Sequence, residues 1–120
     1  MARAGWIMTG LLALFILAAS VAPKLIGASV ATDALTAIGW PDRHLLLIGL
    51  IELAGIVLFI IPRTALVGAV LLTGLLGGAI ASNLRADMPL FSHTLFGVYL
   101  GLFMWAALWL REPRLRAMLP

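Results

Sequence analysis

One carboxyl group in this chain stands where carboxyl groups are rarely found. Glu52 lies within an apolar run, with Leu50 and Ile51 before it and Leu53 and Ala54 after it. A charge at the centre of a membrane-spanning helix costs about 2.5–3.5 kcal/mol on insertion scales, so it normally faces a partner or a cavity. Such a group can bind a ligand, exchange a proton or clamp a neighbouring lysine or backbone group. We favour ligand or proton binding over a purely structural clamp.

A lysine is the first candidate partner for this carboxyl group. Lys24 ends the first apolar run, and its long stem can turn inward toward Glu52 or extend to the lipid head groups. Glu52 lies about 12 Å along the second run at 1.5 Å per residue. The lysine stem together with one water molecule can close that gap. Asn83 or Ser82, near the end of the third run, is the second choice.

Several other polar side chains lie at the same end of the apolar runs or inside them. With Glu52 and Lys24, the ligand-binding candidates are Asn83, Tyr99, His44 and His93. Tyr99 stands inside the fourth run, where its hydroxyl should find a partner or line a cavity. Two histidines without a third ligand do not make a metal site, so no metal is predicted.

Four apolar runs position these side chains. Hydrophobic residues make up 63% of the 120-residue chain and charged residues 11%, against roughly half and a quarter in soluble domains. A helix needs about 20 apolar residues to cross the hydrocarbon layer, and the runs cover residues 6–22, 44–61, 65–82 and 90–110. They are continuous rather than alternating, which excludes a closed barrel. The sequence therefore predicts an all-α integral membrane four-helix bundle, a single transmembrane domain over residues 1–120.

The first run also has features of a secretory signal peptide. Arg3 supplies a positive charge before it, and Ser20, Val21 and Ala22 form a small-residue site of the kind that is cleaved. Pro23 directly after that site is unfavourable for cleavage. We therefore interpret the run as the first membrane span.

The connection between the first two spans has a helical pattern of its own. Val30, Ala34 and Ile38 recur at four-residue spacing. Ser29 is a candidate N-cap and Gly39 a candidate C′ residue. We expect a short amphipathic helix here, lying on or dipping into the outer leaflet.

Small residues at four-residue spacing mark candidate packing faces. The third span has Gly74, Gly78 and Ser82, and the fourth has Gly97 and Gly101. Membrane helices associate through small residues that let their backbones approach closely. These faces could pack within one bundle, or against a protein partner or a second copy of the chain.

Composition and motifs exclude several classes of function. Cysteine is absent, so the chain has no disulfide, thiolate metal site or thiol–disulfide exchange of its own. The net charge of +3 comes from basic residues spread along the chain, which indicates membrane topology rather than nucleic-acid binding. No nucleotide-binding loop, nucleophile elbow or zinc spacing is present. An enzyme acting alone is therefore the least supported class, although a subunit of a quinone-linked oxidoreductase stays open.

Several short sequences give the chain a resemblance to a known family. They are Ile38-Gly39-Trp40-Pro41, the run that contains Gly49, Glu52 and Gly55, the pair Pro62-Arg63, and Gly77-Gly78-Ala79-Ile80. With the order of four spans and the lysine after the first, they resemble the DoxX-like family of small four-span membrane proteins. Near the end of the third span, where the family pattern often has a histidine, this chain has Asn83.

The resemblance implies a fold and a range of roles. Some relatives are subunits of a thiosulfate:quinone oxidoreductase, others are associated with redox-stress complexes, and more distant ones act as membrane chaperones or cargo receptors. We expect a pocket in the outer half of the bundle, lined by Glu52, Lys24, Asn83 and Tyr99, that binds a lipid or a quinone-like molecule. The protein would then be a membrane subunit of a redox or stress-linked assembly.

Two other roles stay open. A non-catalytic membrane chaperone or scaffold would use the buried polar groups only to hold the bundle together. A proton-coupled transporter ranks lower, because the chain has one intramembrane acid and no obvious repeat symmetry.

The division of basic residues predicts the orientation of the chain. Five lie on the face that holds Met1 and three on the opposite face; the first set is Arg3, Arg63, Arg111, Arg114 and Arg116, and the second is Lys24, Arg43 and Arg85. Cytoplasmic loops carry the excess of lysine and arginine. We therefore predict a multi-pass protein of a bacterial-type inner membrane with both termini in the cytoplasm.

A reporter fusion tests this orientation. An enzyme that is active only in the periplasm, fused to the C-terminus, should give no signal, because an even number of spans returns the chain to the cytoplasm. A strong periplasmic signal from that fusion would overturn the orientation.

Overall fold

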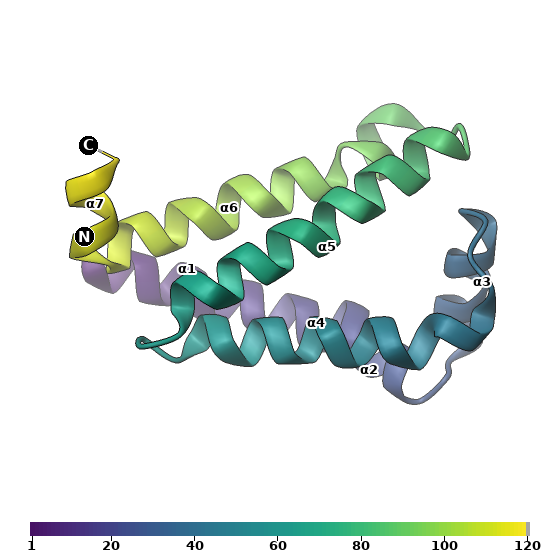
Figure 1. Cartoon of the computed structure of the whole chain (residues 1–120), viewed down its shortest axis with the longest axis horizontal. Helices are drawn as coiled ribbons and strands as arrows, with labels where there is room; N and C mark the ends of the chain where they lie inside the picture. Colours follow the sequence, from purple (N-terminus) through teal and green to yellow (C-terminus); the bar gives the residue numbers. More distant parts are fainter. Residues whose placement is uncertain (120) are drawn as a thin grey trace.

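The regular structure of the chain is entirely helical over residues 1–119, the part that this computed structural model describes (Figure 1). In chain order the elements are α1 (Ala2–Ile16), η1 (Leu17–Val21), α2 (Ala22–Leu25), α3 (Ser29–Ala37), η2 (Asp42–His44), α4 (Leu45–Ile60), α5 (Ala65–Arg85), η3 (Leu90–Thr94), α6 (Phe96–Arg111) and α7 (Pro113–Met118). The segments η1 and η3 are π-helical, and η2 is a 3₁₀ turn.

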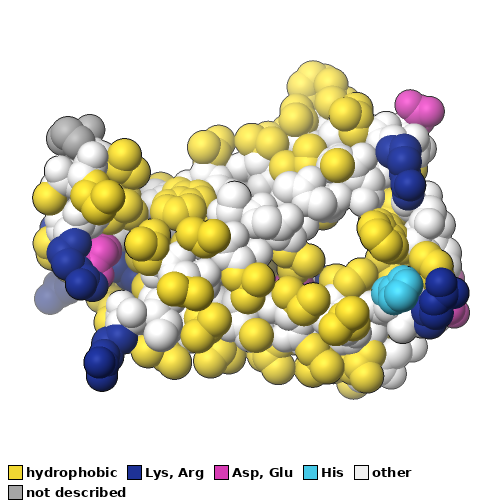
Figure 2. All heavy atoms as spheres, viewed as in Figure 1, with side chains coloured by type: hydrophobic (Ala, Val, Ile, Leu, Met, Phe, Trp, Pro, Cys, Tyr) yellow, Lys and Arg dark blue, Asp and Glu magenta, His cyan; other side chains and the backbone are white. Residues whose placement is uncertain are grey.

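Four continuous helical stretches are long and apolar enough to cross a membrane. They are Ala2–Leu25, Asp42–Ile60, Ala65–Arg85 and Leu90–Arg111. They coincide with the four apolar runs of the sequence and confirm the predicted all-α membrane bundle. Charged side chains gather toward the two ends of the molecule, with hydrophobic side chains between them (Figure 2). An apolar middle between charged ends is the pattern that a bilayer requires.

The first membrane helix is longer than the sequence predicts. The expected end at Ala22 is wrong, because the helix continues through Pro23 to Leu25. In a regular α-helix a proline ring clashes with the carbonyl group four residues earlier. Here the preceding turn is widened, and the amide of Ala22 donates to the carbonyl of Leu17, five residues back. Lys24 therefore belongs to a helix and not to a loop.

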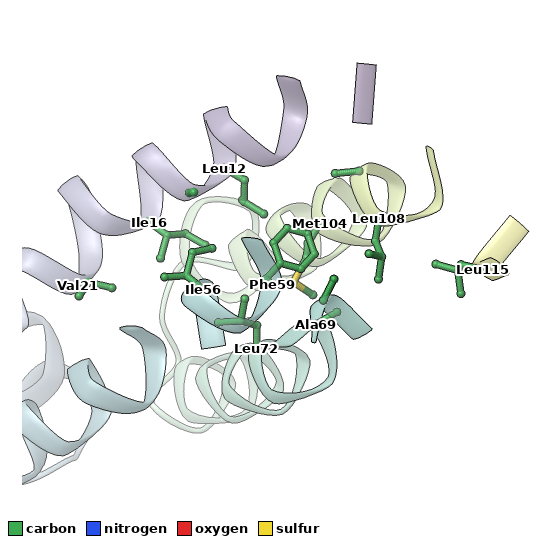
Figure 3. Packing of buried hydrophobic residues seen from close by; sticks show 13 residues of the cluster. Leu12, Ile16, Val21, Ile56, Phe59, Ala69, Leu72, Met104, Leu108 and Leu115 are labelled. Carbon is green, nitrogen blue, oxygen red and sulfur yellow. The ribbon is translucent and has the colours of Figure 1, made fainter. Parts of the chain in front are cut away.

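Most of the buried core lies in the half of the bundle that holds both chain termini. There α1 packs on α6 and α4 packs on α5, and their apolar side chains interdigitate (Figure 3). Ile56 and Phe59 of α4, Ala69 of α5 and Ala107 of α6 are fully buried. Each comes from the half of its helix that lies nearer the termini (Figure 1). We call this end of the molecule the closed end.

Glycines let the helix backbones touch at the closed end. A Cβ atom added at Gly68 of α5 would overlap the backbone nitrogen of Phe59 and lie 2.8 Å from the carbonyl oxygen of Gly55, both in α4. A Cβ atom at Gly5 of α1 would lie 2.7 Å from the carbonyl oxygen of Ala107 in α6. Both helix pairs therefore cross in direct backbone contact, as small residues permit in membranes.

At the opposite end, which we call the open end, two other helix pairs hold together. A Cβ atom at Gly49 of α4 would lie 2.8 Å from the Cβ of Lys24 in α2, and one at Gly97 of α6 would lie 2.8 Å from Cγ1 of Ile80 in α5. Thus α2 stays on α4 and α5 stays on α6, while α4 and α5 diverge from each other (Figure 1).

The glycine stripe of the third span faces this divergence. Gly74 and Gly78 of α5 have no neighbouring atom within 4 Å of the position a Cβ would take. Of the packing partners that the sequence allows for this face, the helices of the same chain are therefore excluded at Gly74 and Gly78. The matching prediction for the fourth span is confirmed at Gly97 and, more loosely, at Gly101, whose Cβ would lie 3.9 Å from Cδ1 of Leu76.

A short helix crosses the open end, as the sequence predicts. This helix, α3, is followed by Gly39 with a φ of 89°. The amides of Gly39 and Trp40 donate to carbonyl groups in its last turn, which is the Schellman arrangement expected of a C′ glycine. The predicted N-cap at Ser29 is wrong by one residue, because the chain turns into the helix at Ala28, whose backbone is extended with a ψ of 141°.

The closed end also contains an arginine that the sequence suggests is a loop cation. Arg111 is only 6% exposed. Its guanidinium donates to the hydroxyl of Thr9 at 2.8 Å and to the backbone carbonyl of Phe59. It also lies 4.3 Å from the centre of the Trp6 ring and 4.5 Å from that of Phe59, in cation–π contact with both. Arg111 therefore ties α1, α4 and α6 together.

The chain ends in the short helix α7, folded back at the closed end. Glu112 caps it by accepting hydrogen bonds from the backbone amide and the Nε of Arg114 at 3.3 and 3.1 Å. The side-chain hydrogen bond from Arg114 lowers the pKa of the Glu112 carboxyl below its ordinary value. Arg116 donates to the carbonyl of Trp109 at 3.0 Å and so satisfies the end of α6.

The backbone contact at Gly68 yields a stability prediction. Gly68→Ala places a methyl group against the α4 backbone, which cannot rotate away, and should lower the free energy of unfolding by about 1–3 kcal/mol. Gly10→Ala is the matched control, because its Cβ would meet no atom within 4 Å. Thermal unfolding in detergent measures both. Equal midpoints for the two variants would contradict the close crossing of α4 and α5.

Candidate functional site

The centre of the candidate site is an ion pair between α2 and α4. Nζ of Lys24 lies 3.2 Å from Oε1 of Glu52, so the predicted partner of the intramembrane carboxyl group is confirmed. Gly49 explains how the two helices come close enough, because it packs directly on the Cβ of Lys24. Gly49 and Glu52 are three residues apart and therefore lie on the same face of α4.

The lysine is held by more than the carboxylate. Its Nζ also donates to the hydroxyl of Ser20 at 2.6 Å. The side chains of Lys24 and Glu52 are 19% and 13% exposed, so both are largely buried within the protein. Within the described chain Lys24 engages only Oε1 of the carboxylate. Oε2 therefore keeps its capacity to accept a hydrogen bond from a molecule in the adjoining space.

Two connected cavities meet at this ion pair. An inner chamber of about 270 Å³ runs toward the core, and a larger one of about 720 Å³ lies between α3, α4 and α5. Polar side chains that line both are Ser20, Lys24, Glu52, Asn83 and His93. The remaining walls are mostly apolar. Concave, mostly apolar spaces with a few converging polar groups are the usual form of a small-molecule site.

Two further polar groups face the cavities with hydrogen-bonding capacity to spare. Asn83 uses its amide nitrogen to donate to the carbonyl of Ala79 at 2.7 Å, which leaves its amide oxygen as an acceptor. The Nδ1 of His93 is within 2.7 Å of the hydroxyl of Ser92. Its Nε2 is the other ring nitrogen, and it can donate or accept according to the tautomer.

The structure brings together most, but not all, of the predicted site residues. Lys24, Glu52, Asn83 and His93 line both cavities, and His44 lines only the larger one.

Tyr99 is the exception and lines neither cavity. It is 47% exposed. Gly97, two residues earlier, faces α5, and two helical residues are separated by about 200° around the axis. The prediction that Tyr99 lines the pocket is therefore corrected: its side chain points outward from the bundle.

A strap across the open end was missed from the sequence. Nε1 of Trp40 donates to the hydroxyl of Ser82 at 3.0 Å, and the guanidinium of Arg85 donates to the carbonyl of Ile38 at 3.1 Å. Residues 29–40, which include α3, are thereby tied to the end of α5, and we call them the strap. The signal in the sequence that could have found the contact is the indole N–H of Trp40, which needs an acceptor.

The chain matches a known family over most of its length. The sequence profile of the DoxX-like family matches residues 7–107. That range includes every polar residue that lines both cavities. No curated protein and no solved structure matches the chain.

The ion pair yields a double-mutant prediction. Lys24→Met and Glu52→Gln should each destabilise the protein, because each leaves the other, largely buried member of the ion pair without its hydrogen-bonded counter-charge. The double variant should lose less than the sum, with a coupling of about 0.5–3 kcal/mol. Unfolding by detergent titration in mixed micelles gives the four free energies.

The exposed pair at the other end is the control for this cycle. Arg114 and Glu112 are similarly close, at 3.1 Å, but the Arg114 side chain is 82% exposed, so Arg114→Met and Glu112→Gln should show weaker coupling. Additive effects at Lys24 and Glu52 would mean that the pair is not energetically linked.

Proposed function

The chain belongs to the DoxX-like family, and on that premise we propose that it binds a lipid or a quinone-like molecule between its helices. The protein acts as a membrane subunit of a redox or stress-linked assembly. It sits in a bacterial-type inner membrane with both termini in the cytoplasm, so the open end lies in the outer half of the bilayer.

The observation that carries this proposal is the cavity beside the ion pair. A volume of about 720 Å³ falls within the roughly 300–1,000 Å³ that small-molecule sites occupy. Empty space in a membrane helix bundle forfeits the packing contacts that hold such helices together. A bound molecule with an apolar body would restore those contacts, and its polar end would meet Glu52, Asn83 and His93.

The role as a subunit rests on the family resemblance, and the composition of the chain is compatible with it. The chain has no cysteine, and the described residues contain no group of three or more metal-ligating side chains. The resemblance to families with quinone-linked subunits supports a division of labour in which this chain holds the ligand and a partner carries the redox chemistry.

A non-catalytic scaffold or membrane chaperone is the second candidate. The observation that favours it is the saturation of Lys24, whose three donors are met by Oε1 of Glu52 and by the hydroxyl and backbone carbonyl of Ser20. In that case the polar groups hold the bundle together and the apolar outer surface contacts a partner.

Retained ligands separate the two candidates. Mass spectrometry of lipids and quinones after mild purification should detect a molecule that stays with the wild-type protein. Glu52→Gln should remain folded yet lose that molecule, or lose the pH dependence of its binding, because the amide no longer carries the carboxylate charge. Glu112→Gln, at the closed end, is the control and should retain it.

The opposite result supports the structural role. If Glu52→Gln remains folded and keeps the same bound molecule at the same occupancy, Glu52 serves the fold and the binding site lies elsewhere or does not exist.

A further inference from the structure

We infer that the ligand enters sideways from the bilayer, between α4 and α5, and that it is a neutral amphipathic molecule whose hydrocarbon tail lies against Gly74 and Gly78. This inference rests on the proposed binding function and adds the route, the tail-binding surface and the charge of the head group.

The side of the bundle is open at the place where α4 and α5 diverge. Leu47 and Ile48 of α4 line one wall of the larger cavity, and Gly74 and Gly78 of α5 line the other. The space-filling view shows an opening in the surface between these two helices (Figure 2). In the membrane this flank faces lipid tails and not water, since both helices are apolar spans.

The strap covers the end of the same cavity. Leu35 and Ile38 line it from that side, and the hydrogen bonds of Trp40 with Ser82 and of Arg85 with Ile38 hold the strap to α5. Entry through the end requires both hydrogen bonds to break, whereas entry through the side requires none to break. The side is therefore the less costly route.

Two glycines of α5 form the surface against which the tail lies. Gly74 and Gly78 are one turn apart on the same face, and open space lies beside both Cβ positions. Gly77 also has open space beside it but lines neither cavity. Bare backbone at positions 74 and 78 thus leaves a shallow track along the cavity wall, while position 77 points elsewhere.

The charges at the inner end of this track select a neutral head group. Lys24 and Glu52 already compensate each other at 3.2 Å. A carboxylate or ammonium head would have to displace one member of the pair or be buried without a counter-charge, and both are costly. A hydroxyl head can instead donate to Oε2 of Glu52 or to the Asn83 oxygen, and a carbonyl head can accept a hydrogen bond from the His93 ring, in each case without disturbing the pair.

Three photoreactive probes with the same tail test the head group. The purified protein in nanodiscs is labelled with diazirine-bearing hexadecanol, hexadecanoate and hexadecylammonium, and the labelled residues are identified by mass spectrometry. Saturable labelling of the cavity-lining residues of α4, α5 and the strap should be strongest for hexadecanol. Preference for either charged probe would overturn the neutral-head inference.

Two variants of one helix test the tail surface and the route. Gly78→Leu fills the track and should reduce cavity labelling by hexadecanol about tenfold or more, since excluding two methylenes of tail is worth that much. Gly77→Leu makes the same chemical change outside the cavity and should leave labelling unchanged. Gly74→Leu repeats the test if Gly78→Leu does not give monodisperse protein; neither meets an atom within 4 Å of its Cβ position.

The outcomes separate this inference from the function on which it rests. Saturable cavity labelling that Gly78→Leu and Gly77→Leu affect equally would overturn the tail surface and leave ligand binding intact. Absence of saturable cavity labelling by all three probes in the wild-type protein would overturn the inference and the proposed binding function together.

Discussion

Backbone contact at two helix crossings sets the shape of the whole molecule. Where Gly68 meets Phe59 and Gly5 meets Ala107, the helices touch with no side chain between them. The four largest fully buried side chains, Phe59, Ile56, Met104 and Leu108, come from the helix halves nearer the termini, so the closed end is filled. Rigid helices that cross at one end separate toward the other unless side chains fill the widening space. Gly74 supplies no side chain where α4 and α5 separate, and the cavity is the result.

Each end of the bundle contains a largely buried cation, and the two cations are stabilised in different ways. Arg111 uses a hydroxyl, a backbone carbonyl and two aromatic rings, all of them neutral groups. Lys24 uses the carboxylate of Glu52 and a serine hydroxyl. A planar guanidinium fits several fixed partners at once, which suits a permanent clasp. A carboxylate with one oxygen still free can accept another donor, so the polar group with spare hydrogen-bonding capacity lies at the open end, beside the cavity.

Much of this arrangement could be predicted from sequence because it depends on composition and short-range spacing. Apolar runs located the four spans, and Gly39 located the end of α3. The cost of an isolated charge in lipid led from Glu52 to Lys24. The error at Tyr99 concerns direction around a helix axis, which the sequence does not indicate because the spans are apolar on every side. The buried contacts of Arg111 were not predicted, because nothing in its neighbourhood in sequence indicates Thr9 or Trp6 as contacts.

Pro23 shows how a local irregularity determines the geometry of the site. A proline after 17 apolar residues favours a helix end, and a lysine in the following loop would extend to the head groups. The widened turn Leu17–Val21 instead carries the helix through the proline to Leu25. Lys24 is thereby held on the face that packs against Gly49 and points at Glu52 rather than at water. π-Helical turns are frequent at functional sites. Here the turn is the local feature that places a lysine at the end of the first span in the wall of the cavity.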